Sequence, residues 1–323
     1  MPILGAACGA LLLAVAAQVH AQGGAQTYPA RPIRLIVPLA AGGGMDTVAR
    51  GVALKLTESL GQTVVVDNRG GGGGSIGAEL AASAPPDGYT LIMMSATSVI
   101  HPLMYKSRYD TSRDFAPISQ VTTQPYVIVV NPKLPIQNVN ELVAYAKADP
   151  DKLNYGSAGQ GTLIHLATEL FKIVTGTRMV HVPYKGIGAA YPDLIAGNIQ
   201  VIFASIISAQ PHVRAQRIRA LAVTGAKRAL SSPELPTGAE AGVKGFAVTQ
   251  WYGVFTPART PRTIVERLHQ EIIKVLQQPE VTARLAADGA EPVGSTPQQL
   301  DAHVRAERDR WSNVIKDAGI RGD

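Results

Sequence analysis

Two glycine-rich segments have the composition of ligand-binding turns. The first turn runs from Pro38 to Asp46 (PLAAGGGMD) and the second turn from Gly156 to Thr162 (GSAGQGT). Each lies between a short apolar run that predicts a strand and a stretch with helical periodicity. Glycine lets the backbone approach a ligand closely, and the free N–H groups of a first helical turn carry a partial positive charge. The two turns could bind a small dianion between them, or they could be ordinary tight turns.

Hydroxyl and carboxyl groups near these turns could complete such a site. Asp46 is a predicted N-cap, because its carboxylate can accept hydrogen bonds from the free N–H groups of the helix that follows. The hydroxyl groups that could add donors are those of Ser157 and Thr162 in the second turn and of Ser95, Thr97 and Ser98 after another predicted strand.

Catalytic and cofactor motifs give little support for an enzyme. The sequence has no G-x-S-x-G, no H-E-x-x-H and no G-K-[ST]. The segment 72–77 formally matches G-x-G-x-x-G, but it lies within a run that begins with five consecutive glycines, and no acidic residue follows at the spacing that a ribose requires. We therefore expect no cofactor and no metal. An exported hydrolase that uses Ser157 or His165 is the alternative enzyme hypothesis.

The N-terminus has the pattern of a signal peptide over residues 1–21. This segment has no Lys, Arg, Asp or Glu, is apolar from Ile3 to Val19, and ends with small residues at Ala21. An uncleaved membrane anchor is the alternative, although the apolar run is short for a membrane span. Cleavage would remove Cys8, the single cysteine of the chain, so the mature protein would have no disulfide.

Composition limits the partners of the chain. Its 323 residues are 46% hydrophobic, enough for about two domains. Aromatic residues make up only 5%, which argues against stacking platforms for nucleic acid, and no basic helix or finger pattern is present. The net charge of +6 favours association with anions.

Strand and helix patterns alternate along the chain, which predicts an α/β fold. The apolar run 33–37 precedes a helix over 46–60, and a short strand at 154–156 precedes a helix over 162–174. Such alternation indicates mainly parallel sheets flanked by helices, here in two lobes.

The last helices have no sheet of their own and are expected to pack on the first lobe, so the chain would cross between the lobes twice. The predicted crossings lie near 124–126 and 248–252. The predicted division is therefore a signal peptide over 1–21, lobe 1 over 22–125 and 250–323, and lobe 2 over 126–249.

An ordered set of segments carries a family resemblance. The segments are Tyr28–Pro38, Gly42–Asp46, Asp87–Leu91, Leu153–Gly159, His181–Gly186, Arg219–Val223 and Trp251–Gly253. The resemblance runs from about Tyr28 to Ile320, almost the whole mature chain, with these segments in order. The sequence resembles the periplasmic solute-binding proteins of the tripartite tricarboxylate transporter family, of the Bordetella uptake gene (Bug) type.

The resemblance implies a type II periplasmic binding protein fold of two α/β lobes joined by two crossing segments. It implies a periplasmic monomer that captures a small organic acid (a mono-, di- or tricarboxylate, with aromatic acids included) between its lobes. Membrane subunits of the transporter would then receive the ligand. A ligand-binding accessory of a membrane sensor is the alternative. No cofactor and no nucleic acid are expected.

The resemblance also implies a set of ligand-binding residues. By position they are Leu39, Ala41, Gly43, Asp46, Thr97, Gly156, Ser157, Gly161, Thr162 and Ser205. Met45 stands where relatives commonly have a small polar residue, which would make that part of the pocket more apolar and suit an aromatic or longer aliphatic acid.

Overall fold

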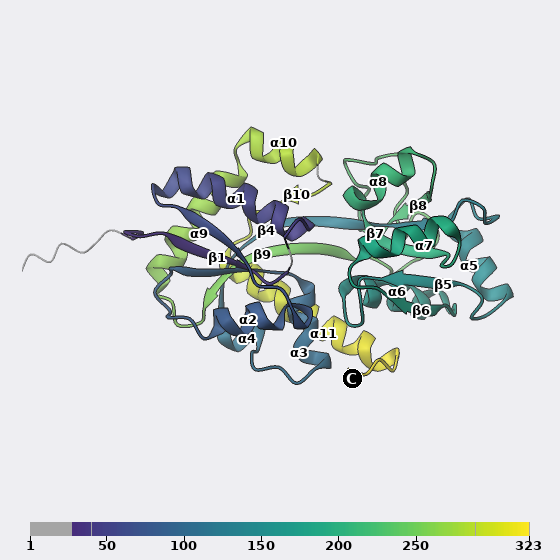
Figure 1. The fold of residues 1–323 in the computed structure, drawn as a ribbon, viewed down its shortest axis with the longest axis horizontal. Helices are drawn as coiled ribbons and strands as arrows, with labels where there is room; N and C mark the ends of the chain where they lie inside the picture. Colours follow the sequence, from purple (N-terminus) through teal and green to yellow (C-terminus); the bar gives the residue numbers. More distant parts are fainter. Residues whose placement is uncertain (1–27, 40, 288, 323) are drawn as a thin grey trace, which may run out of the picture.

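Two α/β lobes lie side by side and are joined by two long strands (Figure 1). The computed structural model describes residues 28–39, 41–287 and 289–322, with only the backbone of Ile207. The predicted signal peptide lies outside the described residues. The two-lobed α/β architecture confirms the fold class predicted from the sequence.

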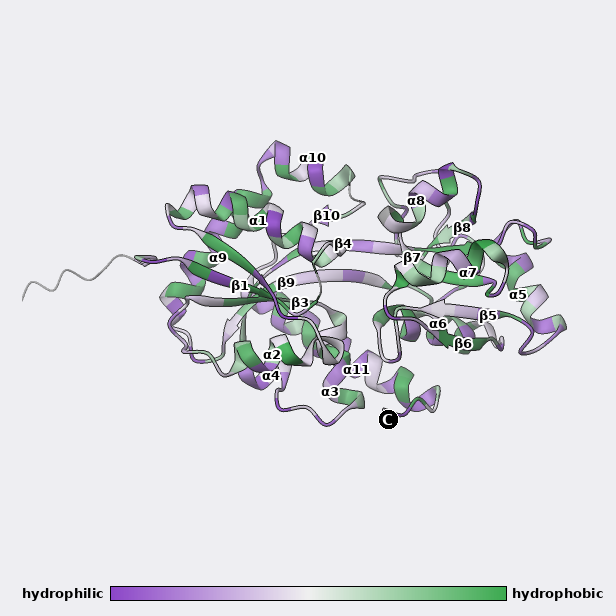
Figure 2. Ribbon diagram, in the orientation of Figure 1, coloured by the Kyte–Doolittle hydropathy of each residue, from purple (hydrophilic) through white to green (hydrophobic). Residues whose placement is uncertain are grey.

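Lobe 1 is built on three parallel strands in the order β2-β1-β3. Their bounds are β1 (Ile33–Val37), β2 (Val64–Asn68) and β3 (Thr90–Met94). The helices of this lobe are α1 (Gly44–Leu60), α2 (Ser75–Ala82), α3 (Ala96–Met104), the short α4 (Thr111–Asp114), α9 (Arg262–Leu276) and α10 (Pro279–Ala287). Helices α1 and α10 carry both hydrophobic and hydrophilic residues, as expected of elements with one buried and one exposed face (Figure 2).

Lobe 2 repeats the arrangement with three parallel strands in the order β7-β5-β6. Their bounds are β5 (Asn154–Ser157), β6 (Val180–Pro183) and β7 (Val201–Ser205), and β8 (Arg219–Val223) pairs with β4. The helices are α5 (Val139–Ala148), α6 (Leu163–Thr175), α7 (Tyr191–Ala196) and α8 (Ile206–Arg214).

The crossing strands are β4 (Phe115–Val130) and β9 (Thr249–Pro257), which run antiparallel. Strand β4 pairs with β9 as far as Pro125, and from Tyr126 onward it pairs with β7 and β8 of lobe 2. This change of partner supports the lobe boundaries, 125/126 and 249/250, that we propose. The sequence predicted only 126–130 of β4, because the buried polar residues Ser119, Thr122 and Gln124 interrupt the apolar pattern of its first half.

The last helix, α11 (Pro297–Asp317), packs on one face of the crossing strands. It contacts β4 and α3 and also reaches α6 of lobe 2, so it joins the two lobes along a shared hydrophobic core. Glu307 of α11 is only 8% exposed and accepts two hydrogen bonds, from Nε1 of Trp251 at 3.1 Å and from Nε1 of Trp311 at 2.9 Å. One carboxylate therefore ties α11 to the crossing strand β9. A short strand, β10 (Glu291–Pro292), precedes α11 and pairs with β4.

Replacing Glu307 tests this tie. Glu307→Ala should lower the free energy of unfolding by about 2–4 kcal/mol, because two buried indole N–H groups lose their acceptor. Glu307→Gln keeps an acceptor oxygen and should cost about half as much or less. Urea unfolding followed by circular dichroism measures both variants. Equal losses in the two would contradict the role of the shared acceptor.

Candidate functional site

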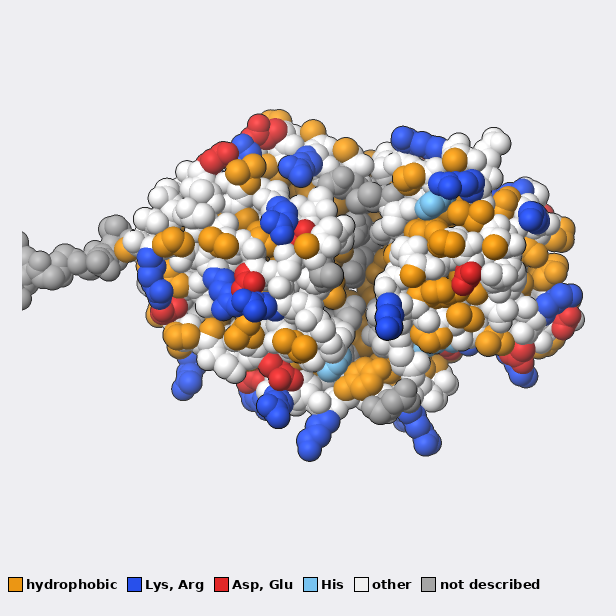
Figure 3. Space-filling view, in the orientation of Figure 1, with side chains coloured by type: hydrophobic (Ala, Val, Ile, Leu, Met, Phe, Trp, Pro, Cys, Tyr) orange, Lys and Arg blue, Asp and Glu red, His pale blue; other side chains and the backbone are white. Residues whose placement is uncertain are grey.

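The carboxyl ends of the parallel strands in both lobes point toward the junction between the lobes. Strand β3 runs antiparallel to β9 from Ile92 beside Phe255 to Met94 beside Gly253, the middle residue of β9, so its carboxyl end points toward the Thr249 end of β9 at the junction. Strand β7 ends with Ser205 beside Tyr126, the first residue of β4 that belongs to lobe 2. Because β1 is parallel to β3 and β5 is parallel to β7, the two glycine turns also lie at the junction. The surface is hollowed there, and we call this hollow the interlobe groove (Figure 3).

Asp46 holds the first turn together instead of capping the helix. The N-cap of α1 is Gly43, and Asp46 lies in the first helical turn, 4% exposed. Its carboxylate accepts hydrogen bonds from the backbone N–H of Gly42 at 2.9 Å, Nδ2 of Asn68 at 3.0 Å and Nε of Arg50 at 3.0 Å. Burial alone would raise the pKa of Asp46, but these hydrogen bonds hold it below its usual value. The predicted N-cap was wrong because the helix begins earlier and the carboxylate turns back toward Gly42.

The other predicted residues of the first turn offer backbone. Leu39, Ala41 and Gly43 are exposed, and the carbonyl of Leu39 accepts a hydrogen bond from Nδ2 of Asn68 at 3.2 Å. Met45, in contrast, is 2% exposed and packs in the hydrophobic core of lobe 1. The inference that Met45 makes the pocket more apolar was therefore wrong, because the helical backbone turns this side chain inward.

The glycine run 70–74 lies against the first turn, a contact that was not predicted from the sequence. A Cβ at Gly74 would lie 3.4 Å from the carbonyl oxygen of Pro38, and a Cβ at Gly77 would lie 2.8 Å from the Cα of Pro38. Residues 72–74 all have positive φ, a conformation that side chains disfavour. Gly74 and Gly77 thus make room for Pro38 at the start of the first turn, and the positive φ angles of residues 72–74 favour glycine there.

Thr97 lies near the start of α3, directly after β3, and is half-buried. The neighbouring hydroxyl groups are committed to the helix itself, since Ser95 and Ser98 form a reciprocal capping box. Helix α3, which contains Pro102, was not predicted from the sequence.

In the second turn, side chains are used to shape the backbone. Ser157 is 0% exposed, and its Oγ accepts a hydrogen bond from the N–H of Gly159 at 3.0 Å. Thr162, the predicted first residue of this helix, is the N-cap of α6; its Oγ1 accepts from the N–H of His165 at 3.4 Å and donates to the carbonyl of Gly159 at 2.8 Å. These hydroxyl groups fix the turn, so a ligand would meet mainly the backbone at the start of α6.

Gly156 and Ser205 complete the predicted set in lobe 2. A Cβ at Gly156 would lie 2.7 Å from Cδ1 of Ile199, so this glycine lets the lobe interior pack closely. Ser205 is the N-cap of α8, where its Oγ accepts from the N–H of Ser208 at 3.4 Å. Helix α8 therefore also begins at the junction between the lobes.

The lobes touch on both sides of the interlobe groove. On one side Gly161, with φ +72°, meets α3: a Cβ there would lie 2.9 Å from Sδ of Met104. Nε2 of Gln160 also donates to the carbonyl of Arg321 at 3.0 Å. On the other side a Cβ at Gly289 would lie 3.4 Å from Ile206. The second turn is thus part of the contact between lobes as well as of the predicted site.

Two histidines lie behind the second turn. His165 accepts a hydrogen bond at Nδ1 from the N–H of Gly161 at 3.2 Å, and Nε2 of His181 lies 2.6 Å from Oγ of Ser157. From the sequence, His165 was named only in the hydrolase hypothesis, and it was not paired with His181. Because the Ser157 side chain is fully buried, its hydroxyl does not reach the interlobe groove.

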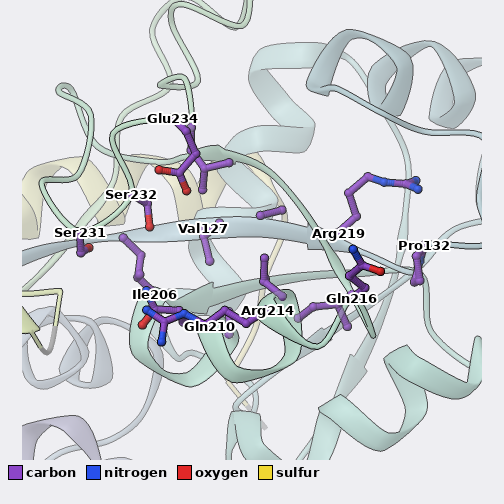
Figure 4. A pocket seen from close by; sticks show the side chains of 15 residues that line it. Val127, Pro132, Ile206, Gln210, Arg214, Gln216, Arg219, Ser231, Ser232 and Glu234 are labelled. Atoms are coloured by element: carbon purple, nitrogen blue, oxygen red, sulfur yellow. The ribbon is translucent and has the colours of Figure 1, made fainter.

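Lobe 2 also has a cavity of about 850 Å³ beside α8, and Ile206 is one of the residues that line it. It lies between α8, the strands β4 and β8, and the segment 231–235, with Ser231 toward one side and Arg219 and Pro132 toward the other (Figure 4). Its lining includes none of the ten predicted residues. Arg219 is already used structurally, since its Nη1 donates to the carbonyl of Ile136 at 2.8 Å.

Within residues 28–39, 41–287 and 289–322, no cluster of three or more His, Cys, Asp or Glu residues could hold a metal ion. None of the helices in this part of the chain combines the length and the apolar character that a membrane span requires.

Comparison with known proteins gives consistent matches. The family model described as "Tripartite tricarboxylate transporter family receptor" matches residues 48–320. Protein BugT of Bordetella pertussis is 38% identical over 300 residues, covering 92% of this chain and 92% of BugT.

Two solved structures from Rhodopseudomonas palustris are also similar. Rpa4515 with adipate is 39% identical with a TM-score of 0.84, covering 92% of this chain and all of the other. MatC with bound malate is 32% identical with a TM-score of 0.78, covering 89% and 100%.

Asp46→Asn tests the carboxylate that holds the first turn. The variant should lower the free energy of unfolding at pH 7 by about 1–3 kcal/mol, because hydrogen bonds to a charged group are lost. The folded-state pKa of Asp46 is lowered, so its contribution is present above the unfolded pKa of about 4 and is lost as the pH falls.

The difference between wild type and Asp46→Asn should therefore shrink when urea unfolding is repeated at pH 3. Asp301→Asn is the control, since it breaks an exposed ion pair with Arg305 and should cost less than about 1 kcal/mol. A difference for Asp46→Asn that grows on acidification would contradict the assigned sign.

Proposed function

The chain belongs to the tripartite tricarboxylate transporter receptor family, and we propose that it captures a small organic acid in the interlobe groove. The observation that carries this proposal is the position of three helix starts, those of α1, α6 and α8, at the junction between the lobes. Free N–H groups at helix starts favour anions, and two facing lobes suit a ligand with a negative charge at each end.

The chemistry of the two turns supports a carboxylate ligand. The one buried carboxylate in the first turn, that of Asp46, is balanced by its own hydrogen bonds, so it need not oppose an anion nearby. The two similar structures hold adipate and malate, which are aliphatic dicarboxylates. The burial of Met45 removes the argument for an aromatic acid, so we place dicarboxylates first among mono-, di- and tricarboxylates.

Capture would proceed by closure of the two lobes about β4 and β9. The ligand would favour the closed state because it contacts both turns only there. A micromolar complex requires about −8 kcal/mol. Hydrogen bonds to a charged group contribute roughly 1.5–3 kcal/mol each, so about four or five would suffice after ordering costs.

We also propose that the protein acts in the periplasm as a binding protein without catalytic activity. The signal peptide pattern and the membership of a transporter receptor family support this location. Membrane subunits of a tripartite tricarboxylate transporter are the proposed recipients of the ligand. A membrane sensor is the alternative recipient, and co-purification with either membrane protein would distinguish the two.

Calorimetric titration tests the class of ligand. We expect at least one of adipate, malate, citrate, benzoate and glutamate to bind with micromolar affinity. Adipamide lacks the charges, so it should bind at least about tenfold more weakly than the best-bound acid because charge-assisted hydrogen bonds are lost. Proton spectra of the acid after incubation should be unchanged, and a new product would support the hydrolase alternative. Failure of every acid to bind would refute the proposal.

Gly43→Leu tests whether the first turn contacts the ligand. Gly43 is exposed and has φ −83°, which other residues adopt without strain, so the fold should be kept. The added side chain should reduce the affinity for the best-bound acid about tenfold or more, because it occupies the start of α1. The control is Gly51→Leu in the same helix, where nothing lies within 4 Å of an added Cβ. Equal affinities in both variants would place the ligand elsewhere.

A further inference from the structure

Three stacked rings lie directly behind the second turn. They are Tyr155 of β5, His181 of β6 and His165 of α6. The ring centroids of the two histidines are 4.0 Å apart with an interplanar angle of 10°, and those of Tyr155 and His181 are 4.9 Å apart. His165 is 3% exposed. Phenyl rings would stack in such a place without the cost of burying polar nitrogens, so the imidazoles require another explanation.

The ring nitrogens of the two histidines form hydrogen bonds at the two ends of the second turn. At one end, Nε2 of His181 pairs with Oγ of Ser157, which in turn accepts the N–H of Gly159. At the other end, Nδ1 of His165 accepts the N–H of Gly161, immediately before the N-cap of α6. The two rings therefore fix the backbone that leads into α6, from inside the lobe.

The surroundings keep both rings neutral, which the contact at Gly161 requires. Burial lowers the pKa of His165 to about 3, and the neighbouring His181 and Lys172 add smaller electrostatic contributions in the same direction. Burial also lowers the pKa of His181 to about 4, with Glu169 opposing and Lys172 reinforcing the shift. Glu169 accepts hydrogen bonds from the hydroxyl of Tyr155 and, at 2.7 Å, from Nζ of Lys172. Nδ1 of His165 is thus an acceptor at neutral pH.

We propose that His165 and His181 are positioning residues for ligand binding, which hold the second turn in the shape that presents the start of α6 to the interlobe groove. This inference rests on the proposed function. Neither ring needs to touch the ligand, since each acts through the backbone or through Ser157. The contact of Gly161 with Met104 links the same turn to lobe 1, so its shape also affects how the lobes meet.

Paired variants separate the polar contacts from the stacking. His165→Phe and His181→Phe keep a ring and remove the nitrogens. His165→Asn keeps a polar atom at the δ position, and His181→Gln keeps one at the ε position, while both remove the ring. Affinity is measured by calorimetric titration with adipate and malate as the probes. The Phe variants should lose about tenfold in affinity, the equivalent of one hydrogen bond. The affinities of the Asn and Gln variants should stay within about threefold of that of wild type. Phe variants that bind like wild type would overturn the proposal.

Measurements without ligand keep the test independent of the proposed function. In nitrogen-15 spectra at pH 7, His165 should be neutral with Nδ1 unprotonated, and a protonated Nδ1 would overturn the proposal. Amide hydrogen exchange at Gly161 should be faster in His165→Phe than in wild type and unchanged in His165→Asn; equal exchange in all three would also overturn it. Failure of wild type to bind any carboxylate, with these two results as expected, would count against the proposed function alone.

Discussion

The antiparallel pair formed by β4 and β9 is the constraint on which the rest of the molecule depends. Each strand passes from one lobe to the other, and their register fixes which ends of the neighbouring strands meet at the junction. Because β3 and β7 both end there, every parallel strand beside them also directs its following turn toward the other lobe. The two glycine turns therefore face each other because of the register of these strands.

At the two facing turns, side chains and backbone have different roles. Asp46, Ser157 and Thr162 direct their polar groups into the turns that contain them, and His165 and His181 support the second turn from behind. We therefore propose that the groups facing the groove are largely backbone and helix starts. Helix starts favour negative charge without the shape demands of a bidentate guanidinium, so such a frame could serve acids of different length with few substitutions.

The sequence predicted those features that depend on local patterns. Apolar periodicity located most strands and helices, and the helices predicted over 46–60 and 162–174 are present as α1 and α6. Helices α3 and α8 were missed, and each contains a proline in its interior, which argues against a helix when sequence alone is read. The first half of β4 was missed because the buried polar residues Ser119, Thr122 and Gln124 interrupt its apolar pattern. The sequence also does not report that Nε2 of Gln124 donates to the hydroxyl of Tyr252 in β9.

The site was predicted less completely, for the same physical reason. The glycine turns are local, so their position followed from the pattern of strand, turn and helix. The contact of His165 with His181 joins β6 to α6, and no spacing in the sequence reports it. The role of Asp46 was misjudged because its partners, Arg50 and Asn68, are set by the start of α1 and the end of β2.

The arrangement around Glu307 also determines what the fluorescence of Trp251 and Trp311 can report about the protein. Both indoles are fully buried on the α11 side of β9, whereas Tyr252, on the opposite face, lies next to Gly44 at the start of α1. A bound acid would have no direct access to either indole. Emission from these tryptophans, shielded from aqueous quenchers such as iodide, would respond to bending of the strand against the last helix and so would record the angle between the lobes.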